Sequence, residues 1–343
     1  MRYIFLWFSS ALVVVLSLPV LAAALPMLLV AKAVRWFAAL TEPEVAAASS
    51  LIQFDPYLGW KPRESLDTHY LVRQDDIFPL VTDSDGWPGR LQLDESQIVV
   101  VGDSFAYGYG ARRGESFADR ISNVKVKALA CLGYDMVQEV LLLRSVAPQL
   151  RGKLVLWWIY LENDLVDNLR PEFRGYRKPF LAKDRETESW KIVTSHVRNE
   201  RWRHTISAKG MEVFAHLCTE SAIADHYYDA CDWLIGQASE VCRAHDASLV
   251  IMTIPNVNQL SSSGNRRLLG YGVNHELFEP AYPDRRIGQI CERRGVQFMP
   301  LMPRLEPKDY KRHERFHWNP SGHRKAADAV LEAWTAWGSA QGR

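Results

Sequence analysis

The sequence has no marked excess of either charge and few cysteines. Its 343 residues include 41 Lys and Arg against 40 Asp and Glu, which gives a formal net charge of +1 at pH 7. Because chains that bind nucleic acid usually show a clear basic excess, this balance argues against DNA or RNA as a partner. The cysteines form no Cys-x-x-Cys pair typical of zinc sites and are too few for a small disulfide-stapled fold. We expect buried, inert thiols at most of the five positions, which are Cys131, Cys218, Cys231, Cys242 and Cys291.

Internal repeats, low-complexity tracts and the composition of a disordered chain are also absent. Hydrophobic residues make up 48% of the chain and charged residues 24%, which is ample material for a folded core. The length corresponds to about two domains, or to one large domain with an appendage. The apolar residues are unevenly distributed, because many of them lie in the first forty positions.

A long uncharged run occupies the N-terminal part of the chain. No charged residue occurs in 3–31, a stretch longer than the roughly 20 apolar residues that cross a bilayer and longer than the apolar region of an ordinary signal peptide. We therefore expect residues 1–40 to form one uncleaved transmembrane anchor. A signal peptide cleaved near 22–24 and a helical hairpin are the alternatives. Positive charges flank the run almost equally on both sides, so charge does not determine its orientation.

Residues 41–96 show no sustained helical or strand period. The segment 51–95 is rich in Pro, Gly, Asp and aromatic residues, so we expect a linker followed by ordered loops and short strands. The sequence TDSDGWPG at 82–89 predicts a tight turn. We expect this turn to belong to an edge hairpin that packs against the main domain, and a direct role in substrate binding is the alternative.

Residues 97–338 alternate between predicted strands and predicted helices. The strands are short apolar runs bounded by turn residues, and the helices carry apolar residues on one face. Such alternation predicts an α/β fold with a doubly wound, mainly parallel sheet covered on both faces, whose ligands bind at the carboxyl ends of the strands. The expected strands are 97–101, 124–130, 153–160, 248–254 and 296–299, and the expected helices are 136–146, 222–245, 284–293 and 322–337.

Ser104 directly follows the first of these strands, in the triplet Gly102-Asp103-Ser104. Its hydroxyl is therefore expected at the carboxyl edge of the sheet, where a neighbouring base is needed to make it a nucleophile. The segment is not a Gly-x-Ser-x-Gly elbow, because Ala106 takes the place of the second glycine, and no Gly-Lys-Ser/Thr follows to make a phosphate-binding loop. A purely structural turn is the alternative for this triplet.

Asn163 and Asp164 follow the strongest predicted strand, 153–160. The side-chain amide of Asn163 is able to donate a hydrogen bond to a developing oxyanion, which an ionised carboxylate cannot do. Taken alone, the pair is also typical of a helix cap or an Asx-turn.

His317 lies just before the Pro-Ser-Gly turn that opens the last predicted helix. Glu314, three residues earlier, is a candidate for the carboxylate that holds such a histidine in one tautomer. His313 and His323 are the competing candidates for the base. His323 falls in the first turn of the helix, where we expect packing or contact with solvent.

In chain order, these segments resemble the SGNH (GDSL-type) hydrolases. The resemblance covers about residues 97–337 and leaves the interval 170–245 almost unconstrained. The complete layout, with an N-terminal span and an Asp-Pro-x-Leu-Gly-Trp segment at 55–60, resembles membrane-anchored bacterial members of this family. The residues that carry the resemblance are Gly102-Asp103-Ser104-Phe105, Gly133 in ACLGYDMVQE, Asn163-Asp164 and His317-Trp318-Asn319-Pro320-x-Gly322-His323.

The resemblance implies a flavodoxin-like three-layer αβα sandwich and a serine esterase that uses no metal and no cofactor. In such an enzyme Ser104 attacks the ester carbonyl, His317 accepts its proton and Glu314 orients His317. The backbone N–H groups of Ser104 and Gly133 and the side-chain amide of Asn163 form the oxyanion hole.

The sequence departs from the family pattern at two positions. Family members usually carry Asp where Glu314 stands, and the longer side chain needs a displaced backbone or another rotamer to make the same hydrogen bond. They often carry Asn where Ala128 stands, so a loop-ordering contact is in doubt. Asp103 is expected to stabilise its loop and to take no part in the chemistry.

The expected domains are an anchor at 1–40, a linker and short-strand segment at 41–96, and a hydrolase domain at 97–338 with an insertion at about 165–247. Anchored members of the family generally work on the outer side of the inner membrane, often on O-acyl groups of cell-surface glycans. The resemblance therefore implies a single-pass protein of the inner (cell) membrane. Its periplasmic or otherwise extracytoplasmic domain is expected to remove acyl groups, mainly acetyl, from a polysaccharide.

A basic, aromatic stretch lies in the expected insertion. Residues 171–204 hold nine Lys or Arg against five Asp or Glu, interleaved with Phe173, Tyr176, Trp190 and Trp202. This stretch is interpreted either as a cradle for an anionic glycan or lipid headgroups, or as a solvated insertion. Two alternative functions stay open. One is a carbohydrate O-acetyltransferase with the same Ser–His site and a partner that delivers the acyl group, and the other is a non-catalytic, membrane-tethered glycan-binding module.

Overall fold

The computed structural model describes residues 45–46, 51–73, 76–199, 210–312 and 316–340. The expected membrane anchor at 1–40 and most of the linker after it lie outside these ranges. Among the helices within them, none combines the length and the apolar character that crossing a bilayer requires.

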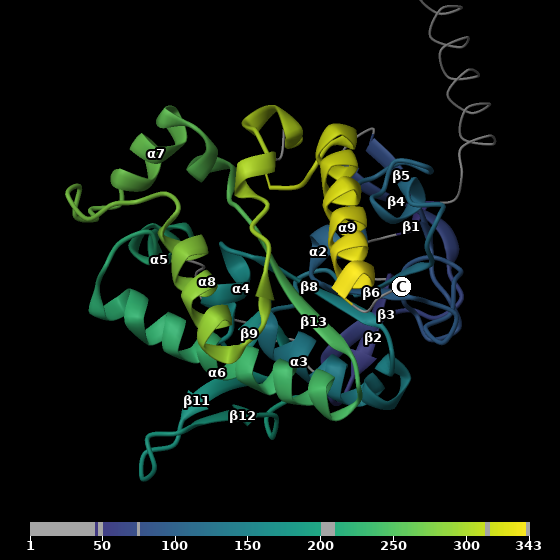
Figure 1. The fold of residues 1–343 in the computed structure, drawn as a ribbon, viewed down its shortest axis with the longest axis horizontal. Helices are drawn as coiled ribbons and strands as arrows, with labels where there is room; N and C mark the ends of the chain where they lie inside the picture. Colours follow the sequence, from purple (N-terminus) through teal and green to yellow (C-terminus); the bar gives the residue numbers. More distant parts are fainter. Residues whose placement is uncertain (1–44, 47–50, 74–75, 200–209, 313–315, 341–343) are drawn as a thin grey trace, which may run out of the picture. The chain divides into compact units, whose positions relative to one another are not determined.

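Five parallel strands form the central sheet (Figure 1). Their order is β14, β13, β8, β6, β7, so the first of them along the chain lies between the second and the third. This is the order of flavodoxin-like folds, in which ligands bind where the winding reverses, here between β6 and β8. All expected strands are present to within two residues, as β6 (Ile98–Gly102), β7 (Val126–Ala130), β8 (Leu154–Tyr160), β13 (Ser248–Ile254) and β14 (Gln297–Phe298).

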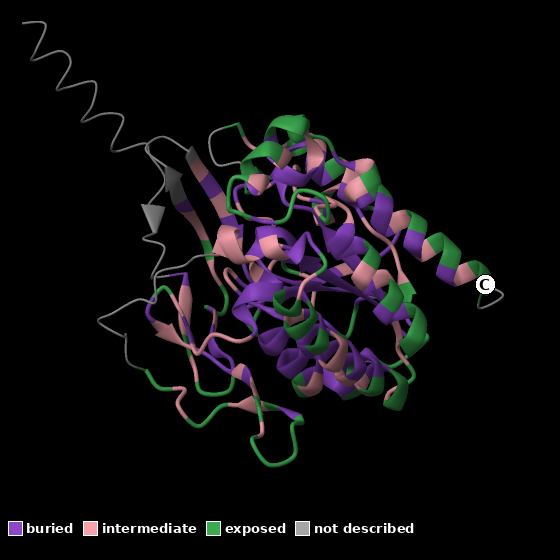
Figure 2. Ribbon diagram, turned by 90° about the vertical axis from the view of Figure 1, so that its left-hand side faces the viewer, coloured by how far each residue is buried: buried purple, intermediate pink, exposed green. Residues whose placement is uncertain are grey.

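Helices cover both faces of this sheet. The covering helices are α3 (Met136–Val146), α6 (Ala222–Ala244), α8 (Tyr282–Arg294) and α9 (Pro320–Ala340). Val99 and Trp157 pack into the core beneath α3, α6 and α8, whereas their chain neighbours Val100 and Trp158 pack into the core beneath α9. The strands are therefore buried on both sides (Figure 2), and the expected α/β class with a parallel sheet in three layers is confirmed.

Capping groups in the sequence determine where the helices begin and end. The Asp135 carboxylate accepts hydrogen bonds from the backbone N–H groups of Val137 and Gln138 at 3.0 and 3.2 Å, and so caps α3. Gly295, at φ 65°, ends α8 in the left-handed conformation that suits glycine. All four expected helices are present, and α8 and α9 extend one to three residues further at their ends.

The other helices of the described ranges are short, and too few turns are present for their apolar period to be visible in the sequence. They are α2 (Ser104–Tyr107), α4 (Asn163–Asp167), α5 (Gly210–Leu217) and α7 (Ser262–Leu269). The 3₁₀ turns are η2 (Ala118–Arg120), η3 (Ala147–Leu150), η4 (Val257–Leu260), η5 (Met302–Arg304) and η6 (Pro307–Asp309).

Two antiparallel hairpins precede the sheet. The 82–89 turn that follows them is held by Asp83, whose carboxylate accepts hydrogen bonds from the N–H groups of Asp85 and Trp87. The other oxygen of Asp83 lies 2.7 Å from the ammonium of Lys127 on β7, and both side chains are fully buried. The turn thus packs against the main domain. The hairpins pair β2 (Ile52–Asp55) with β3 (Gly59–Pro62) and β4 (Asp67–Arg73) with β5 (Asp76–Val81), and β1 (Val45–Ala46) lies parallel to β4.

Two further small hairpins lie between β8 and α6. A fully buried ion pair between Lys178 and Asp135 joins this region to the start of α3. The Lys178 ammonium also donates a hydrogen bond to the carbonyl of Asp167 at 2.8 Å. The described part of the chain after α4, up to residue 199, is thus tied to the helical layer that covers the sheet. Its hairpins pair β9 (Glu172–Phe173) with β10 (Tyr176–Arg177) and β11 (Phe180–Lys183) with β12 (Trp190–Val193).

The five cysteines are all buried and unpaired. Burial penalises the thiolate and raises the pKa of both Cys242 and Cys291 to about 12. The expectation of buried, inert thiols is confirmed.

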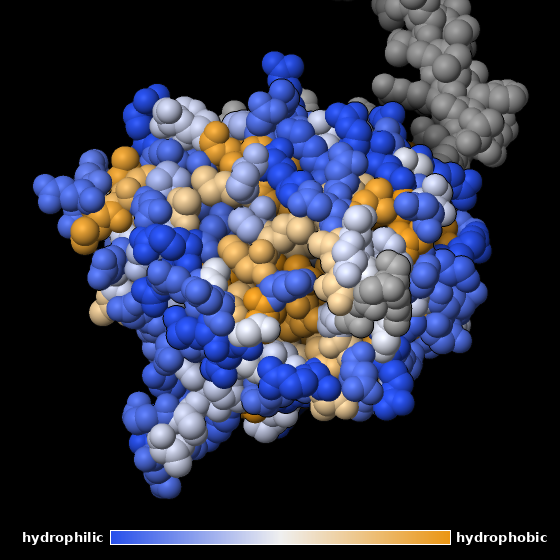
Figure 3. Space-filling view, in the orientation of Figure 1, coloured by the Kyte–Doolittle hydropathy of each residue, from blue (hydrophilic) through white to orange (hydrophobic). Residues whose placement is uncertain are grey.

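The face of the molecule seen in Figure 3 is mainly hydrophilic. Apolar residues are exposed on it mostly in the hollow between α8 and α9, over β13 and β14. β14 pairs with β13 through two residues only, so this edge of the sheet is short and the helices beside it leave part of the flank uncovered.

The buried carboxyl of Asp284, in the first turn of α8, makes stability depend on pH. It accepts a hydrogen bond from the Thr253 hydroxyl on β13, and burial raises its pKa to about 6. The folded state holds this proton more tightly than the unfolded chain does. Its stabilising effect is therefore complete below about pH 4 and is lost as the pH rises through 6. We compare the free energy of unfolding of Asp284→Asn with that of the wild type. We predict that the difference, variant minus wild type, is up to about 3 kcal/mol larger at pH 8 than at pH 4.

Urea unfolding of the full-length protein at several pH values measures this difference. Asp328→Asn, the same change at an exposed position of α9, is the matched control and is expected to show no such pH dependence. A difference between Asp284→Asn and the wild type that stays constant from pH 4 to pH 8 would contradict the prediction.

Candidate active site

Ser104 is the first residue of α2, at the carboxyl end of β6. The strand ends at Gly102, where a Cβ atom would lie 2.9 Å from the Cβ of Ala106, so a larger side chain has no room there. Asp103 caps the short helix, because its carboxylate accepts a hydrogen bond from the N–H of Phe105 at 2.9 Å. This tight turn stabilises the loop and leaves Ser104 half-buried at the edge of the sheet.

His317 is held by the loop that leads into α9. The N–H of Lys311 donates a hydrogen bond to the His317 carbonyl at 2.8 Å. The Asn319 side chain accepts hydrogen bonds from the N–H groups of Ser321 and Gly322 at 2.8 and 3.2 Å, and so caps α9 two residues after the histidine. A side chain at Gly322 would lie 2.5 Å from a backbone oxygen, so only glycine fits the loop against the helix. The sequence after His317 thus positions it from the C-terminal side.

Ser104 and His317 are in hydrogen-bonding contact. Nε2 of His317 lies 2.9 Å from Oγ of Ser104. The imidazole also contacts the rings of Tyr109 and Phe105, with centroids 4.7 and 5.3 Å away, and these contacts restrict its orientation. Oδ2 of Asp103 lies 3.3 Å from the same hydroxyl. A serine hydroxyl beside an imidazole that is able to take its proton is the arrangement of an activated nucleophile.

Of the other candidates for the triad, the structure describes only His323. Glu314 and His313 lie outside the described residues. His323 is buried at the start of α9, packed edge-on against Trp318 at 5.6 Å. Burial lowers its pKa to about 3, so its ring is neutral, and neither ring nitrogen meets a hydrogen-bond partner in the described part of the chain. Of the histidines whose place is described, His317 is the one that contacts Ser104.

Gly133 and Asn163 lie at the same edge of the sheet as Ser104. Gly133 follows β7 and Asn163 follows β8, and these are the two strands that flank β6. Both residues are half-buried. Gly133 has φ 72°, and a Cβ there would lie 2.3 Å from the ring of Phe173, so the position excludes other residues by conformation and by space. Parallel pairing therefore brings three of the predicted site residues to neighbouring strand ends.

Asn163 begins α4 and is not its cap, since Glu162 occupies the cap position without a side-chain bond. The structural role falls instead to Asp164, whose carboxylate accepts a hydrogen bond from the N–H of Tyr160 at 2.7 Å. The Asn163 side-chain amide therefore takes no part in capping α4.

Glu139, a buried acid near this edge, was not singled out from the sequence. The Glu139 carboxylate on α3 accepts a hydrogen bond from the Trp157 indole at 2.7 Å. Burial raises the pKa of Glu139 and of Asp164 well above the ordinary values, and it also raises that of Asp103. A raised pKa means that burial disfavours the negatively charged form of each of these carboxyl groups. The signal in the sequence was a lone acid inside the apolar run of α3.

Trp60 supports the Gly133 loop from the N-terminal hairpins. Its indole N–H donates a hydrogen bond to the Leu132 carbonyl at 3.0 Å, and its own carbonyl accepts one from the Tyr134 hydroxyl at 2.7 Å. Its ring also stacks on Phe173, with centroids 6.0 Å apart. The segment at 55–60 that the sequence singled out thus holds the loop on both sides of Gly133.

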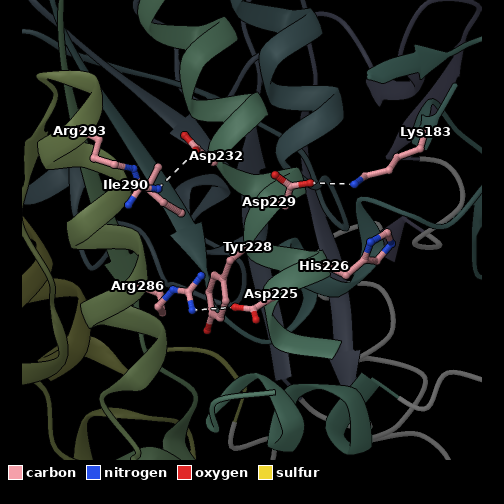
Figure 4. Close-up of a pocket in the computed structure, with 9 residues that line it drawn as sticks. All are labelled: Lys183, Asp225, His226, Tyr228, Asp229, Asp232, Arg286, Ile290 and Arg293. Carbon is pink, nitrogen blue, oxygen red and sulfur yellow. Dashed lines mark hydrogen bonds and ion pairs between the residues drawn. The ribbon is translucent and has the colours of Figure 1, made fainter. Parts of the chain in front are cut away.

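A separate, charged cavity of about 450 Å³ lies between α6 and α8 (Figure 4). It contains none of the predicted site residues, and its acids are paired with cations of the same cavity. Within the described ranges, no cluster of three or more His, Cys, Asp or Glu side chains is arranged to hold a metal ion. The ion pairs of this cavity are Asp225–Arg286 at 2.9 Å, Asp229–Lys183 at 3.0 Å and Asp232–Arg293 at 3.3 Å.

Comparisons with known proteins find structural likenesses at low identity. No protein-family profile matches the chain, and no curated protein sequence does. Solved structures similar to it include a psychrotrophic esterase, EstA, from Pseudoalteromonas sp. (12% identity, TM-score 0.39, 70% of this chain and 97% of that one). A GDSL-like lipase from Bacteroides thetaiotaomicron has 11% identity and a TM-score of 0.38 over 71% and 90% of the two chains. An extracellular lipase from Streptomyces rimosus has 13% identity and a TM-score of 0.41 over 69% and 99%.

The hydrogen bond between the Trp60 indole and the Leu132 carbonyl is expected to limit how often the Gly133 loop opens. Trp60→Phe keeps a ring against Phe173 but removes the indole N–H, and loss of one such hydrogen bond costs about 1 kcal/mol. We predict that amide hydrogen exchange of residues 131–134 becomes about fivefold faster, because the loop opens locally more often. Exchange measured by mass spectrometry on the full-length protein tests this.

Trp190→Phe is the matched control. Its indole N–H also makes one hydrogen bond, to the Asp229 carboxylate at 3.0 Å, and it is buried in a different part of the molecule. It is expected to leave exchange at 131–134 unchanged. Equal acceleration in both variants would mean that the loop responds to overall stability and not to the Trp60 contact.

Proposed function

We propose that this protein is a serine ester hydrolase of the SGNH (GDSL-type) class. The observation that carries the proposal is the 2.9 Å contact between Ser104 Oγ and His317 Nε2 at the carboxyl edge of the sheet. Gly133 and Asn163, at the ends of the two flanking strands, supply the donors that such a site needs for an oxyanion.

The proposed reaction has two halves. Ser104 Oγ attacks the ester carbonyl carbon while His317 Nε2 takes the hydroxyl proton, and the carbonyl oxygen becomes an oxyanion. When this intermediate collapses, the bond to the alcohol breaks and His317 returns the proton to the alcohol. Water then attacks the acyl-serine, again giving a proton to His317, and the acid leaves as the proton returns to Ser104.

In this proposal Glu314 orients the imidazole through Nδ1, and Asn163 donates to the oxyanion together with the N–H groups of Ser104 and Gly133. The substrate proposed is an acyl ester, mainly an O-acetyl ester, of a carbohydrate. Transfer of the acyl group to a sugar hydroxyl uses the same first half-reaction, so water and sugar compete as acceptors in the second half.

Labelling by a fluorophosphonate probe tests the nucleophile. We predict that the full-length protein in detergent is labelled, and that Ser104→Ala and His317→Ala abolish labelling and lower kcat/KM on p-nitrophenyl acetate by at least about 10³-fold. Asn163→Ala is expected to lower kcat by about 10²–10³-fold with little change in KM, because its bond forms mainly in the transition state.

Ser262→Ala and His226→Ala, at exposed positions, are the matched controls and are expected to retain labelling. A folded protein that the probe does not label would favour a non-catalytic glycan-binding module. Acetyl transfer to an added oligosaccharide in preference to hydrolysis would favour the acetyltransferase. Glu314→Gln with full activity would remove Glu314 from the proposed triad.

We further propose that residues 1–40 anchor the protein in the inner membrane and that the hydrolase domain lies on the extracytoplasmic side. The support is the uncharged run at 3–31. We predict that alkaline phosphatase fused to the C-terminus is active in cells, since that enzyme matures only outside the cytoplasm. A well-expressed but silent fusion, alongside an active cytoplasmic reporter at the same position, would contradict this orientation.

A further inference from the structure

A basic cavity of about 430 Å³ lies between the β2–β3 hairpin and the segment 176–199. Its size falls within the range of roughly 300–1,000 Å³ typical of small-ligand sites. The two walls meet at Gly59, where φ is 90° and a Cβ would lie 2.6 Å from the Arg177 carbonyl oxygen. Only glycine allows so close an approach at this point, and the contact joins the two walls.

Three guanidinium groups, from Arg63, Arg177 and Arg198, line the basic cavity. No carboxylate is among its lining residues in the part of the chain that the structure describes. Arg63 and Arg198 are exposed, and neither forms an ion pair with a described residue. The cavity between α6 and α8 differs in this respect, because each of its acids has a cation partner (Figure 4). An anionic ligand that contacts Arg63 and Arg198 therefore displaces no carboxylate of a described residue.

Aromatic and amide side chains accompany the arginines. Phe54 is 37% exposed, and Tyr176 lies on the opposite wall. Gln53 and Asn199 bring amides that both donate and accept hydrogen bonds. Ring faces beside amides suit the apolar faces and hydroxyl groups of a sugar. A concave site of this composition favours a charged saccharide over the flat surface of a membrane.

The basic cavity is connected to the Gly133 loop through Trp60. The Trp60 ring lines the cavity, stacks on Phe173 and donates its N–H to the carbonyl of Leu132. Phe173 in turn lies against Gly133. These contacts of Trp60 with Phe173 and Leu132 link one wall of the cavity to the Gly133 loop.

We propose that the basic cavity binds the anionic group, a carboxylate or a phosphate, of an acidic saccharide and so holds an oligomeric substrate beside Ser104. This inference rests on the proposed hydrolase function, since it names the class of substrate for that site. In this proposal the anionic group and the acyl group are carried by different sugars of one chain, because Ser104, Gly133 and His317 are not among the residues that line the cavity.

Calorimetric titration of full-length Ser104→Ala protein in detergent tests the proposal without relying on turnover. The probes are a hexauronate, a phosphorylated hexaose and neutral maltohexaose. We expect at least one anionic oligosaccharide to bind about tenfold or more tightly than the neutral one, with an affinity that falls as salt is raised from 0.05 to 0.5 M. The carboxylate and phosphate probes distinguish the two sources of charge.

Arg63→Gln combined with Arg198→Gln is expected to weaken binding of the preferred anionic oligosaccharide by at least tenfold. Arg185→Gln combined with Arg266→Gln removes the same charge from exposed positions that do not line the cavity, and is expected to bind as the parent does. Equal affinity for anionic and neutral oligosaccharides, or equal loss in both double variants, overturns the proposal. So does binding to none of the three oligosaccharides.

Failure of the hydrolase proposal and failure of the cavity proposal give different results. If the protein with Ser104 intact neither reacts with the fluorophosphonate nor cleaves p-nitrophenyl acetate, the catalytic assignment fails, and with it the claim that the cavity serves substrate. If the protein cleaves the ester but shows no preference for anionic oligosaccharides, only the present inference fails.

Discussion

Parallel pairing of β6 with β7 on one side and β8 on the other is the constraint on which the rest of the site depends. Because all three strands run the same way, their carboxyl ends meet at one edge. The residue types that follow those ends are a serine, a glycine at positive φ and an asparagine. The crossover helices that parallel pairing requires also cover both faces of the sheet, so the edge is the place left for polar chemistry.

The segments outside the sheet act on that edge from two directions. The loop before α9 brings His317 onto Ser104 from the C-terminal side, held by the Asn319 cap. The N-terminal hairpins bring Trp60 onto the Gly133 loop. The hairpins are therefore part of the architecture of the site and also form one wall of the basic cavity.

Two fully buried ion pairs hold these outer segments against the central sheet and its helices. Lys127 with Asp83 joins the 82–89 turn to β7, and Lys178 with Asp135 joins the hairpins after β8 to α3. Burying both charges costs desolvation that their attraction must offset, and removing one partner typically costs about 3–5 kcal/mol because the other charge is then stranded. Such pairs specify where each segment docks, since a displaced segment would leave a buried charge alone.

The sequence by itself determined the alternation of strands and helices and the parallel class of the sheet. It also placed Ser104, Gly133 and Asn163 after strands. These features follow from local apolar patterns and turn residues. The sequence also marked the loop of His317 through its Asn, Pro and Gly. Only the tertiary structure decided that His317, 213 residues from Ser104, lies 2.9 Å from it. It alone placed His323 in the core, Glu139 near the site and three arginines around one cavity. These relations arise from packing between distant segments, and no local pattern encodes which segments meet.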